Sequence, residues 1–368
     1  MKMRYFIVSL SLICSFLSSF GEKNIIVDAL DGSLIEGATI LGESGLILGL
    51  SDENGRINEP PANQYPISIR NVGYEPTILE KSVDTIRLVP AVYSLNEIVI
   101  NPNERPIKRV ICFAREYATG ATNSDTLQFY SEYMLESFLK DADKKVKGYK
   151  SGDASPKVRN KRQYARITNA QGLDSVARPK DDDEITLLSW KEMLEVPDYK
   201  FHERKEISEG AKGVAVMGKY GPAYIFRKQN DIYSMTTDHL SEYKDHKWSP
   251  LFLKLLGMTI EADNMQSCLA YKVNDSGDYS FDDFIYSTYS IHLLAKGKLF
   301  KKIFHTDQPI EMDTYIELYP ISMTYITPEE YKELRAEKQE IPFQEALNQQ
   351  PLPEGVEKII ERIENRND

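Results

Sequence analysis

The stretch Ile47-Leu48-Gly49-Leu50-Ser51-Asp52-Glu53-Asn54-Gly55-Arg56-Ile57 joins a short apolar run to a turn and a further apolar position. Its centre, Asp52-Glu53-Asn54-Gly55, is a turn sequence, because glycine and asparagine tolerate the positive φ that tight turns need. Similar apolar runs recur at about ten-residue spacing without a helical period. Short strands separated by such turns predict an antiparallel β-sandwich. We therefore expect a first domain over residues 22–101, with runs at 24–28, 39–41, 47–50, 66–70, 85–89 and 97–100.

Four pieces of this region follow one another as in a known family. In order and spacing they resemble the carboxypeptidase regulatory-like domain, which is a transthyretin-like, Ig-like sandwich. The resemblance covers about a fifth of the chain and implies that fold for residues 22–101. The pieces are Asp31-Gly32-Ser33-Leu34-Ile35-Glu36-Gly37-Ala38-Thr39-Ile40, Ser51-Asp52-Glu53-Asn54-Gly55-Arg56-Ile57, Ile67-Ser68-Ile69-Arg70-Asn71-Val72-Gly73-Tyr74-Glu75 and Ile86-Arg87-Leu88.

A second resemblance concerns the segment Ser94-Leu95-Asn96-Glu97-Ile98-Val99-Ile100. It is similar to the acidic-aliphatic segment that follows this domain in TonB-dependent outer-membrane receptors. The residues after 101 are too few for a plug and a barrel of about 22 strands, and they hold no glycine-rich, plug-like region. The resemblance therefore indicates a cell-envelope context rather than a receptor.

The first residues have the pattern of an export signal. Lys2 and Arg4 precede an apolar stretch of about a dozen residues, too short to span a bilayer comfortably. Small residues at Ser19 and Gly21 fit the positions that precede signal-peptide cleavage. We expect residues 1–21 to be a signal peptide cleaved between Gly21 and Glu22, and the protein to be periplasmic or associated with the outer membrane. The alternative is an apolar N-terminal helix that stays attached.

Composition excludes several classes of protein. Charged residues make up 27% of the chain and the mean hydropathy is -0.43, which excludes a polytopic membrane protein. Hydrophobic residues make up 41%, which is too many for a wholly disordered chain. The net charge of -11 argues against a nucleic-acid partner.

Pro102 and Pro106 mark a linker. After it, the pattern of residues 106–340 predicts a second, larger α+β domain with a large antiparallel sheet. Ile107, Val110, Ile111, Ala114 and Tyr117 have helical spacing, so we expect a helix from 106 to 120. A second helix is expected over 250–256. Strands are expected over 126–139, 213–218, 223–227, 269–273, 285–294, 299–305 and 314–325.

Two capping boxes predict helix starts, Ser189-Trp190-Lys191-Glu192 and Thr327-Pro328-Glu329-Glu330. The end of the chain, 341–368, is expected to be a charged tail or helix. Its apolar stripe is Val356, Ile359, Ile360 and Ile363. The order of elements in the second domain also resembles the half-barrel of LolA-like lipoprotein carriers, which implies a cavity for an apolar or lipid-like ligand.

Catalytic motifs are missing from the sequence. It has no G-x-S-x-G elbow, H-E-x-x-H helix, Walker loop or G-x-G-x-x-G, so we assign no catalytic, cofactor-binding or metal residues. His239-Leu240-Ser241-Glu242 has the spacing of two zinc ligands, but no third ligand accompanies it, and we interpret these as ordinary surface residues. Cys112 and Cys268 fit no disulfide framework; we favour two buried free thiols, with a pair as the alternative.

A basic stretch stands out in this acidic chain. It could contact anionic lipid headgroups, and the alternative is an exposed loop or hairpin tip between two strands. Its residues are Lys144, Lys145, Lys147, Lys150, Lys157, Arg159, Lys161 and Arg162.

These observations favour an exported envelope protein with a non-catalytic binding or scaffolding role toward a protein, glycan or lipid. The alternatives are a carrier of an apolar ligand, or a hydrolase whose site lies in residues 106–340. The largest cavity should discriminate between them, because a tyrosine-lined cavity favours the carrier and clustered titratable groups favour the enzyme.

Overall fold

The computed structural model describes residues 24–93, 105–122, 126–140, 145–168, 174–177, 204–207, 213–229, 231–255, 257–274, 277, 279–298, 301, 308–337 and 340–365. In these residues the chain is mainly β with one large antiparallel sheet, as the sequence predicts. The signal peptide, the run 97–100, the capping box at Ser189 and Lys144 lie outside the described residues, as does nearly all of the run 299–305.

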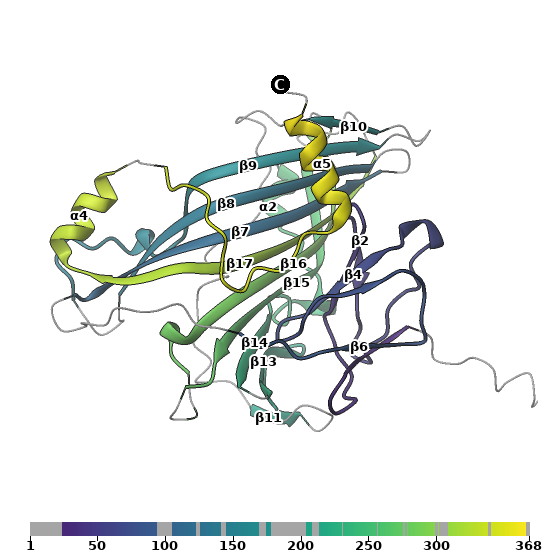
Figure 1. Cartoon of the computed structure of the whole chain (residues 1–368), viewed down its shortest axis with the longest axis horizontal. Helices are drawn as coiled ribbons and strands as arrows, with labels where there is room; N and C mark the ends of the chain where they lie inside the picture. The colour runs from purple at the N-terminus through teal and green to yellow at the C-terminus, as the bar shows by residue number, and fades with distance from the viewer. Residues whose placement is uncertain are drawn as a thin grey trace, which may run out of the picture.

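Residues 24–93, here called the N-terminal unit, hold short strands in two small sheets (Figure 1). One sheet pairs β1 with β6 in parallel, where the sequence predicts only antiparallel pairs. The other has the order β3-β2-β4-β5. Apolar side chains of both sheets share one core that includes Ile26, Ile40, Ile69 and Ile86. The strands are β1 (Ile25–Asp28), β2 (Thr39–Gly42), β3 (Ile47–Leu50), β4 (Ile67–Arg70), β5 (Thr77–Leu79) and β6 (Thr85–Leu88).

The large sheet has 11 strands in the order β10-β9-β8-β7-β17-β16-β15-β14-β13-β12-β11. In Figure 1 β7 to β9 lie at the top, while β13 and β14 lie lower, beside the N-terminal unit. The strands are β7 (Ile107–Ala121), β8 (Thr126–Lys140), β9 (Lys157–Thr168), β10 (Asp174–Ala177), β11 (Arg204–Ile207), β12 (Gly213–Met217), β13 (Pro222–Gln229), β14 (Ile232–Asp238), β15 (Met258–Lys272), β16 (Phe284–Gly297) and β17 (Ile310–Ile326).

The prediction of a helix from 106 to 120 is wrong, because residues 107–121 form β7 in the middle of the sheet. β7 pairs with β17 on one side and with β8 on the other. A strand covered on both faces carries apolar residues at odd and even positions alike. Val110 and Ala114 point to one face while Phe113 and Tyr117 point to the other, and together they imitate a helical period.

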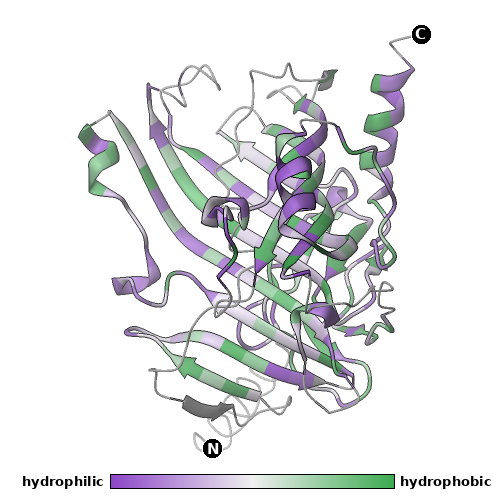
Figure 2. Cartoon of the chain, turned by 90° about the vertical axis from the view of Figure 1, so that its left-hand side faces the viewer, coloured by the Kyte–Doolittle hydropathy of each residue, from purple (hydrophilic) through white to green (hydrophobic). Residues whose placement is uncertain are grey.

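The two faces of the sheet bury different side chains. One face of the large sheet is turned toward the N-terminal unit and is called the N-terminal face. On β7 it carries Phe113, Arg115 and Tyr117. The opposite face carries Val110, Cys112 and Ala114 in one extended apolar cluster. Hydrophobic and hydrophilic bands alternate along the strands in Figure 2, as expected when successive residues point to opposite faces.

The N-terminal unit is tied to the large sheet by buried contacts. Arg70 and Glu317 form an ion pair of 2.7 Å, with side chains 2% and 1% exposed. The Tyr286 hydroxyl accepts a hydrogen bond of 3.1 Å from the Gly73 amide. Leu41 packs in the cluster around Tyr117. These contacts join the two parts of the chain on either side of the linker that Pro102 and Pro106 mark.

The helices fall close to where the sequence places them. α2 (Leu251–Leu255) lies within the predicted segment 250–256. α4 (Pro328–Ala336) begins at the predicted capping box of Thr327 and Glu330, with both reciprocal hydrogen bonds formed. α5 (Glu354–Glu364) buries Val356, Ile359 and Ile363 over the end of the sheet near β9 and β10 (Figure 1). The amphipathic stripe predicted for the end of the chain is therefore confirmed.

The basic stretch divides into two halves: Lys157, Arg159, Lys161 and Arg162 belong to β9, whereas Lys145, Lys147 and Lys150 lie in the connection between β8 and β9. Arg159 pairs with Glu136, Arg162 with Glu132 and Lys157 with Asp153. Arg162 also lies over the Phe343 ring, 4.0 Å from its centroid. Three of the eight basic residues are thus neutralised by carboxylates, which reduces the charge that they offer to a lipid surface. Lys145, Lys147 and Lys150 are exposed.

The buried carboxylate Asp153 predicts acid sensitivity. Burial raises its pKa, but hydrogen bonds from Lys157, Tyr331 and Arg335 outweigh burial and lower the pKa to about 2. A lowered folded-state pKa stabilises the fold above the unfolded pKa of about 4, and this stability is lost as the pH falls toward 2. We expect the free energy of unfolding to decrease between pH 4 and pH 2, as measured by urea unfolding.

The variant Asp153→Asn separates the contribution of Asp153 to the pH-dependent free energy of unfolding from that of the other acidic residues. This variant should be less stable than the wild type at pH 7, and the difference should shrink toward pH 2. A constant difference between pH 7 and pH 2 would show that the stabilising role of Asp153 does not depend on its ionisation.

Candidate functional site

A cavity of about 500 Å³ lies between the N-terminal unit and the large sheet. Its size is within the range of small-molecule sites, about 300–1,000 Å³. On the sheet side it is lined by β13, β14, β15 and β16, and on the other side by residues 33–39 and 70–74 of the N-terminal unit. The cavity is therefore completed only when the two parts of the chain meet.

The sheet side of the cavity carries small polar side chains in two cross-strand rows. In one row Thr236 on β14 lies opposite Cys268 on β15, which lies opposite Thr288 on β16. Small side chains do not fill the roughly 10 Å between two packed β-layers. The polar rows thus leave the cavity open and supply hydrogen-bonding groups to it. The second row is Asp238, Gln266 and Ser290 on the same three strands.

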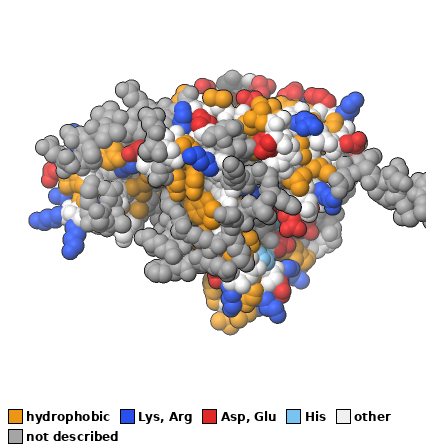
Figure 3. Space-filling view, turned by 90° about the horizontal axis from the view of Figure 1, so that it is seen from below, with side chains coloured by type: hydrophobic (Ala, Val, Ile, Leu, Met, Phe, Trp, Pro, Cys, Tyr) orange, Lys and Arg blue, Asp and Glu red, His pale blue; other side chains and the backbone are white. Residues whose placement is uncertain are grey.

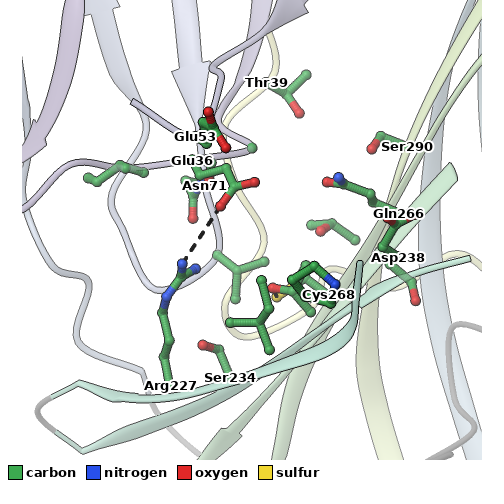
Figure 4. A pocket seen from close by; sticks show the side chains of 18 of the residues that line it. Glu36, Thr39, Glu53, Asn71, Arg227, Ser234, Asp238, Gln266, Cys268 and Ser290 are labelled. Carbon is green, nitrogen blue, oxygen red and sulfur yellow. Dashed lines mark hydrogen bonds and ion pairs between the residues drawn. The ribbon is translucent and has the colours of Figure 1, made fainter. Parts of the chain in front are cut away.

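The N-terminal unit supplies the facing groups, as Figure 4 shows. Asn71 donates to the Glu36 carbonyl at 3.0 Å. The Glu36 carboxylate in turn pairs across the cavity with Arg227 of β13 at 3.8 Å. Gly37 approaches Gln266 so closely that a Cβ there would lie 3.6 Å from its Oε1 atom. Two layers thus hold amide, hydroxyl, carboxylate and guanidinium groups around one space.

His246 lies at the rim of the cavity. His246 Nδ1 lies 3.1 Å from Asp238 Oδ2, and Nε2 lies 3.0 Å from the Tyr220 carbonyl. Both partners only accept hydrogen bonds, so the ring satisfies both when each nitrogen carries a proton. Asp245 and His246 have positive φ of 59° and 50°, a strained backbone that turns the imidazole toward the cavity.

A second cavity of about 350 Å³ adjoins the first, and the two share Thr39, Ser290 and Tyr315. His292 lines it, 2.8 Å from Asp313 and 3.8 Å from Asp263. The Asp313 carboxylate accepts a hydrogen bond from His292 Nδ1, and this bond raises the pKa of His292. The open space therefore continues along the N-terminal face from β13 toward β17, with Ile47, Leu50 and Ile291 beside the polar groups of the second cavity.

Cys112 and Cys268 are free thiols, as favoured from the sequence; Cys112 is buried and Cys268 is partly buried. They lie on opposite faces of the sheet: Cys112 is in the apolar cluster of the opposite face, and Cys268 lines the cavity. Burial raises the pKa of both thiols, that of Cys268 to about 11. Because the thiolate is the nucleophile, this environment does not activate Cys268.

The residues with zinc-ligand spacing point to separate partners. His239 Nε2 lies 2.9 Å from the Ser267 hydroxyl, whereas Glu242 accepts from the Lys219 amide at 3.2 Å. Within the described residues no three His, Cys, Asp or Glu side chains gather in a way that could hold a metal ion. Ser267 and His239 have the spacing of a nucleophile and base. Ser267 lines the cavity but is only 2% exposed.

Sequence reasoning missed the cavity residues. The available signal was the alternation of polar residues in Asn264-Met265-Gln266-Ser267-Cys268 and in Thr288-Tyr289-Ser290-Ile291-His292. Such alternation indicates one polar face. It does not reveal that another part of the chain lies over that face. The tyrosines mostly form sheet core, as in the stacked pair of Tyr117 and Tyr315 with ring centroids 6.1 Å apart.

Comparisons with known proteins add little to this description. No family model matches the chain, and no curated protein matches it. A solved structure concerned with lipid–protein interactions in lipovitellin is similar at 9% sequence identity and a TM-score of 0.27. The match covers 67% of this chain and 27% of that one, so this chain spans about a quarter of the length of that protein. A likeness at this level carries no information about function.

None of the helices in the described part of the chain combines the length and the apolar character needed to cross a bilayer.

Proposed function

We propose that this protein is an exported cell-envelope protein that binds a polar, hydroxyl-rich ligand, such as an oligosaccharide, without catalysis. The proposal includes a carboxypeptidase regulatory-like, transthyretin-like sandwich for the N-terminal unit, and cleavage of the export signal before Glu22. Both rest on the sequence resemblances and the signal-peptide pattern. The observation that carries the binding function is the cavity of about 500 Å³ between the two layers, which polar and apolar side chains line together.

The lining of the cavity favours a polar ligand over an apolar one. Asn71, Gln266 and Ser290 each offer both donors and acceptors, as ligand hydroxyl groups do. Of the three tyrosines that line the cavity, Tyr74 and Tyr315 are buried and Tyr220 is exposed, so one aromatic side chain is open to a fatty chain. This argues against the carrier of an apolar ligand.

Two candidate nucleophiles at the cavity, Cys268 and Ser267, are poorly placed to react. The pKa of the Cys268 thiol is raised, and the Ser267 hydroxyl is buried. These two observations favour binding over hydrolysis.

Isothermal titration calorimetry tests the proposal with cellobiose, maltose and chitobiose as polar probes and palmitate as the apolar probe. We expect measurable binding of at least one disaccharide. Gln266→Leu, which removes a hydrogen-bonding amide at nearly constant size, should weaken that binding about tenfold, because one lost hydrogen bond costs about 1.4 kcal/mol.

The matched control is Thr324→Val on β17, an exposed position that does not line the cavity. It should leave binding unchanged. Binding of palmitate alone would favour the carrier instead. Release of monosaccharides from any of the three probes would show a hydrolase.

A further inference from the structure

Helix α2 presents large apolar side chains to solvent. Leu251, Phe252 and Leu255, here called the α2 tip, are 73%, 62% and 89% exposed. Leu253, between them, packs instead against the apolar cluster of the opposite face. Three neighbouring apolar side chains with this exposure are unfavourable in water and indicate an interaction surface.

The backbone that carries the α2 tip is held at both ends. Before the helix, Trp248 and Ala262 exchange two backbone hydrogen bonds of 2.9 Å each. After it, the Gly257 amide donates to the Lys254 carbonyl at 3.0 Å, and β15 begins at Met258. These bonds fix the direction of the helix, so the apolar side chains stay directed outward.

Three lysines lie in α2 or beside the start of β15, which follows it. Lys254 belongs to the helix itself, and Lys296 lies opposite Thr259 at the end of β16. The Lys298 amide donates to the Gly257 carbonyl at 3.4 Å. All three lysines are exposed. A chain with a net charge of -11 therefore has a locally basic surface at this point.

Figure 1 shows α2 behind the large sheet. In Figure 3, hydrophobic, basic and acidic side chains lie next to one another at the lower tip of the molecule, which corresponds to the rear of Figure 1.

We propose that the α2 tip inserts into the surface of a lipid bilayer that contains anionic headgroups. Leu251, Phe252 and Leu255 would enter the boundary between headgroups and acyl chains, and Lys254, Lys296 and Lys298 would contact lipid phosphates. A small projecting tip fits a deformable bilayer. It offers far less than the roughly 800 Å² per partner of a stable protein interface. The proposal is independent of ligand binding in the cavity.

Vesicle co-sedimentation of the full chain tests this proposal. The vesicles contain either phosphatidylcholine alone or phosphatidylcholine mixed with phosphatidylglycerol. We expect binding to the mixed vesicles that weakens as salt is raised, because exposed charges are screened. Leu251→Ser/Phe252→Ser/Leu255→Ser should lower the partition coefficient at least tenfold. Lys298→Gln should lower it about fivefold.

The matched controls are Ile78→Ser and Val92→Ser, because Ile78 and Val92 are 62% and 89% exposed but lie in the N-terminal unit. They should bind like the wild type. A Phe252→Trp variant should show a blue shift of tryptophan emission with mixed vesicles. The proposal is overturned if the wild type ignores mixed vesicles or if the triple variant binds them equally well. Loss of a dimer in the triple variant, with no vesicle binding by the wild type, would assign the surface to a second copy.

Discussion

Replacing Arg70 by methionine is expected to destabilise the protein by about 3–5 kcal/mol, because it leaves the Glu317 carboxylate buried without its partner. Burial alone would lower the pKa of Arg70, but attraction to Glu317 outweighs burial and raises it, so the guanidinium stays charged. Arg70 also donates to the Pro351 carbonyl and lies 5.7 Å from the centroid of the Tyr117 ring. One side chain thus connects the N-terminal unit, β17 and the segment before α5.

Urea unfolding of three variants separates the ion pair from simple loss of packing. Arg70→Met/Glu317→Leu should recover much of the lost stability, because no unpaired charge remains buried. Arg87→Met, on an exposed position of β6, should change stability by less than about 0.5 kcal/mol. A loss below about 1 kcal/mol in Arg70→Met would mean that water reaches Glu317 and that the two parts of the chain separate easily.

Gly55→Val is expected to destabilise the N-terminal unit by about 1–3 kcal/mol. Gly55 has φ of 67°, which side chains with a branched Cβ rarely adopt. A Cβ at this position would also lie 2.6 Å from the Ile26 carbonyl oxygen, which no relaxation of a flexible side chain can relieve. The Asp52 carboxylate accepts from the Asn54 and Arg56 amides, so the turn cannot move freely.

The control for this prediction is Gly32→Val. Gly32 has a similar φ of 75°, but no heavy atom lies within 4 Å of a Cβ built there. Gly32→Val should lower the free energy of unfolding by about 1 kcal/mol, because it adds only backbone strain. Hydrogen exchange of residues 24–93 measures both losses. Equal losses at the two glycines would show that φ alone, and not the contact with Ile26, governs the turn.

Local elements followed from the sequence where neighbouring residues decide them. The turn at Gly55 depends on one backbone angle, and the start of α4 depends on Thr327 and Glu330, which satisfy each other's backbone groups. The stripe of Val356, Ile359 and Ile363 likewise needs only the period of one helix. The mainly β class followed from short apolar runs between turns.

Tertiary structure decided the rest, because those features depend on residues that are distant in the chain. β7 has a helix-like pattern only because the N-terminal unit and the opposite-face cluster cover its two faces. Arg159 and Arg162 form ion pairs with Glu136 and Glu132 because β9 pairs with β8 and places these carboxylates beside them. The candidate site follows the same rule: the polar rows of β14 to β16 are present in the sequence, but they line a cavity only because residues 33–39 and 70–74 fold over them.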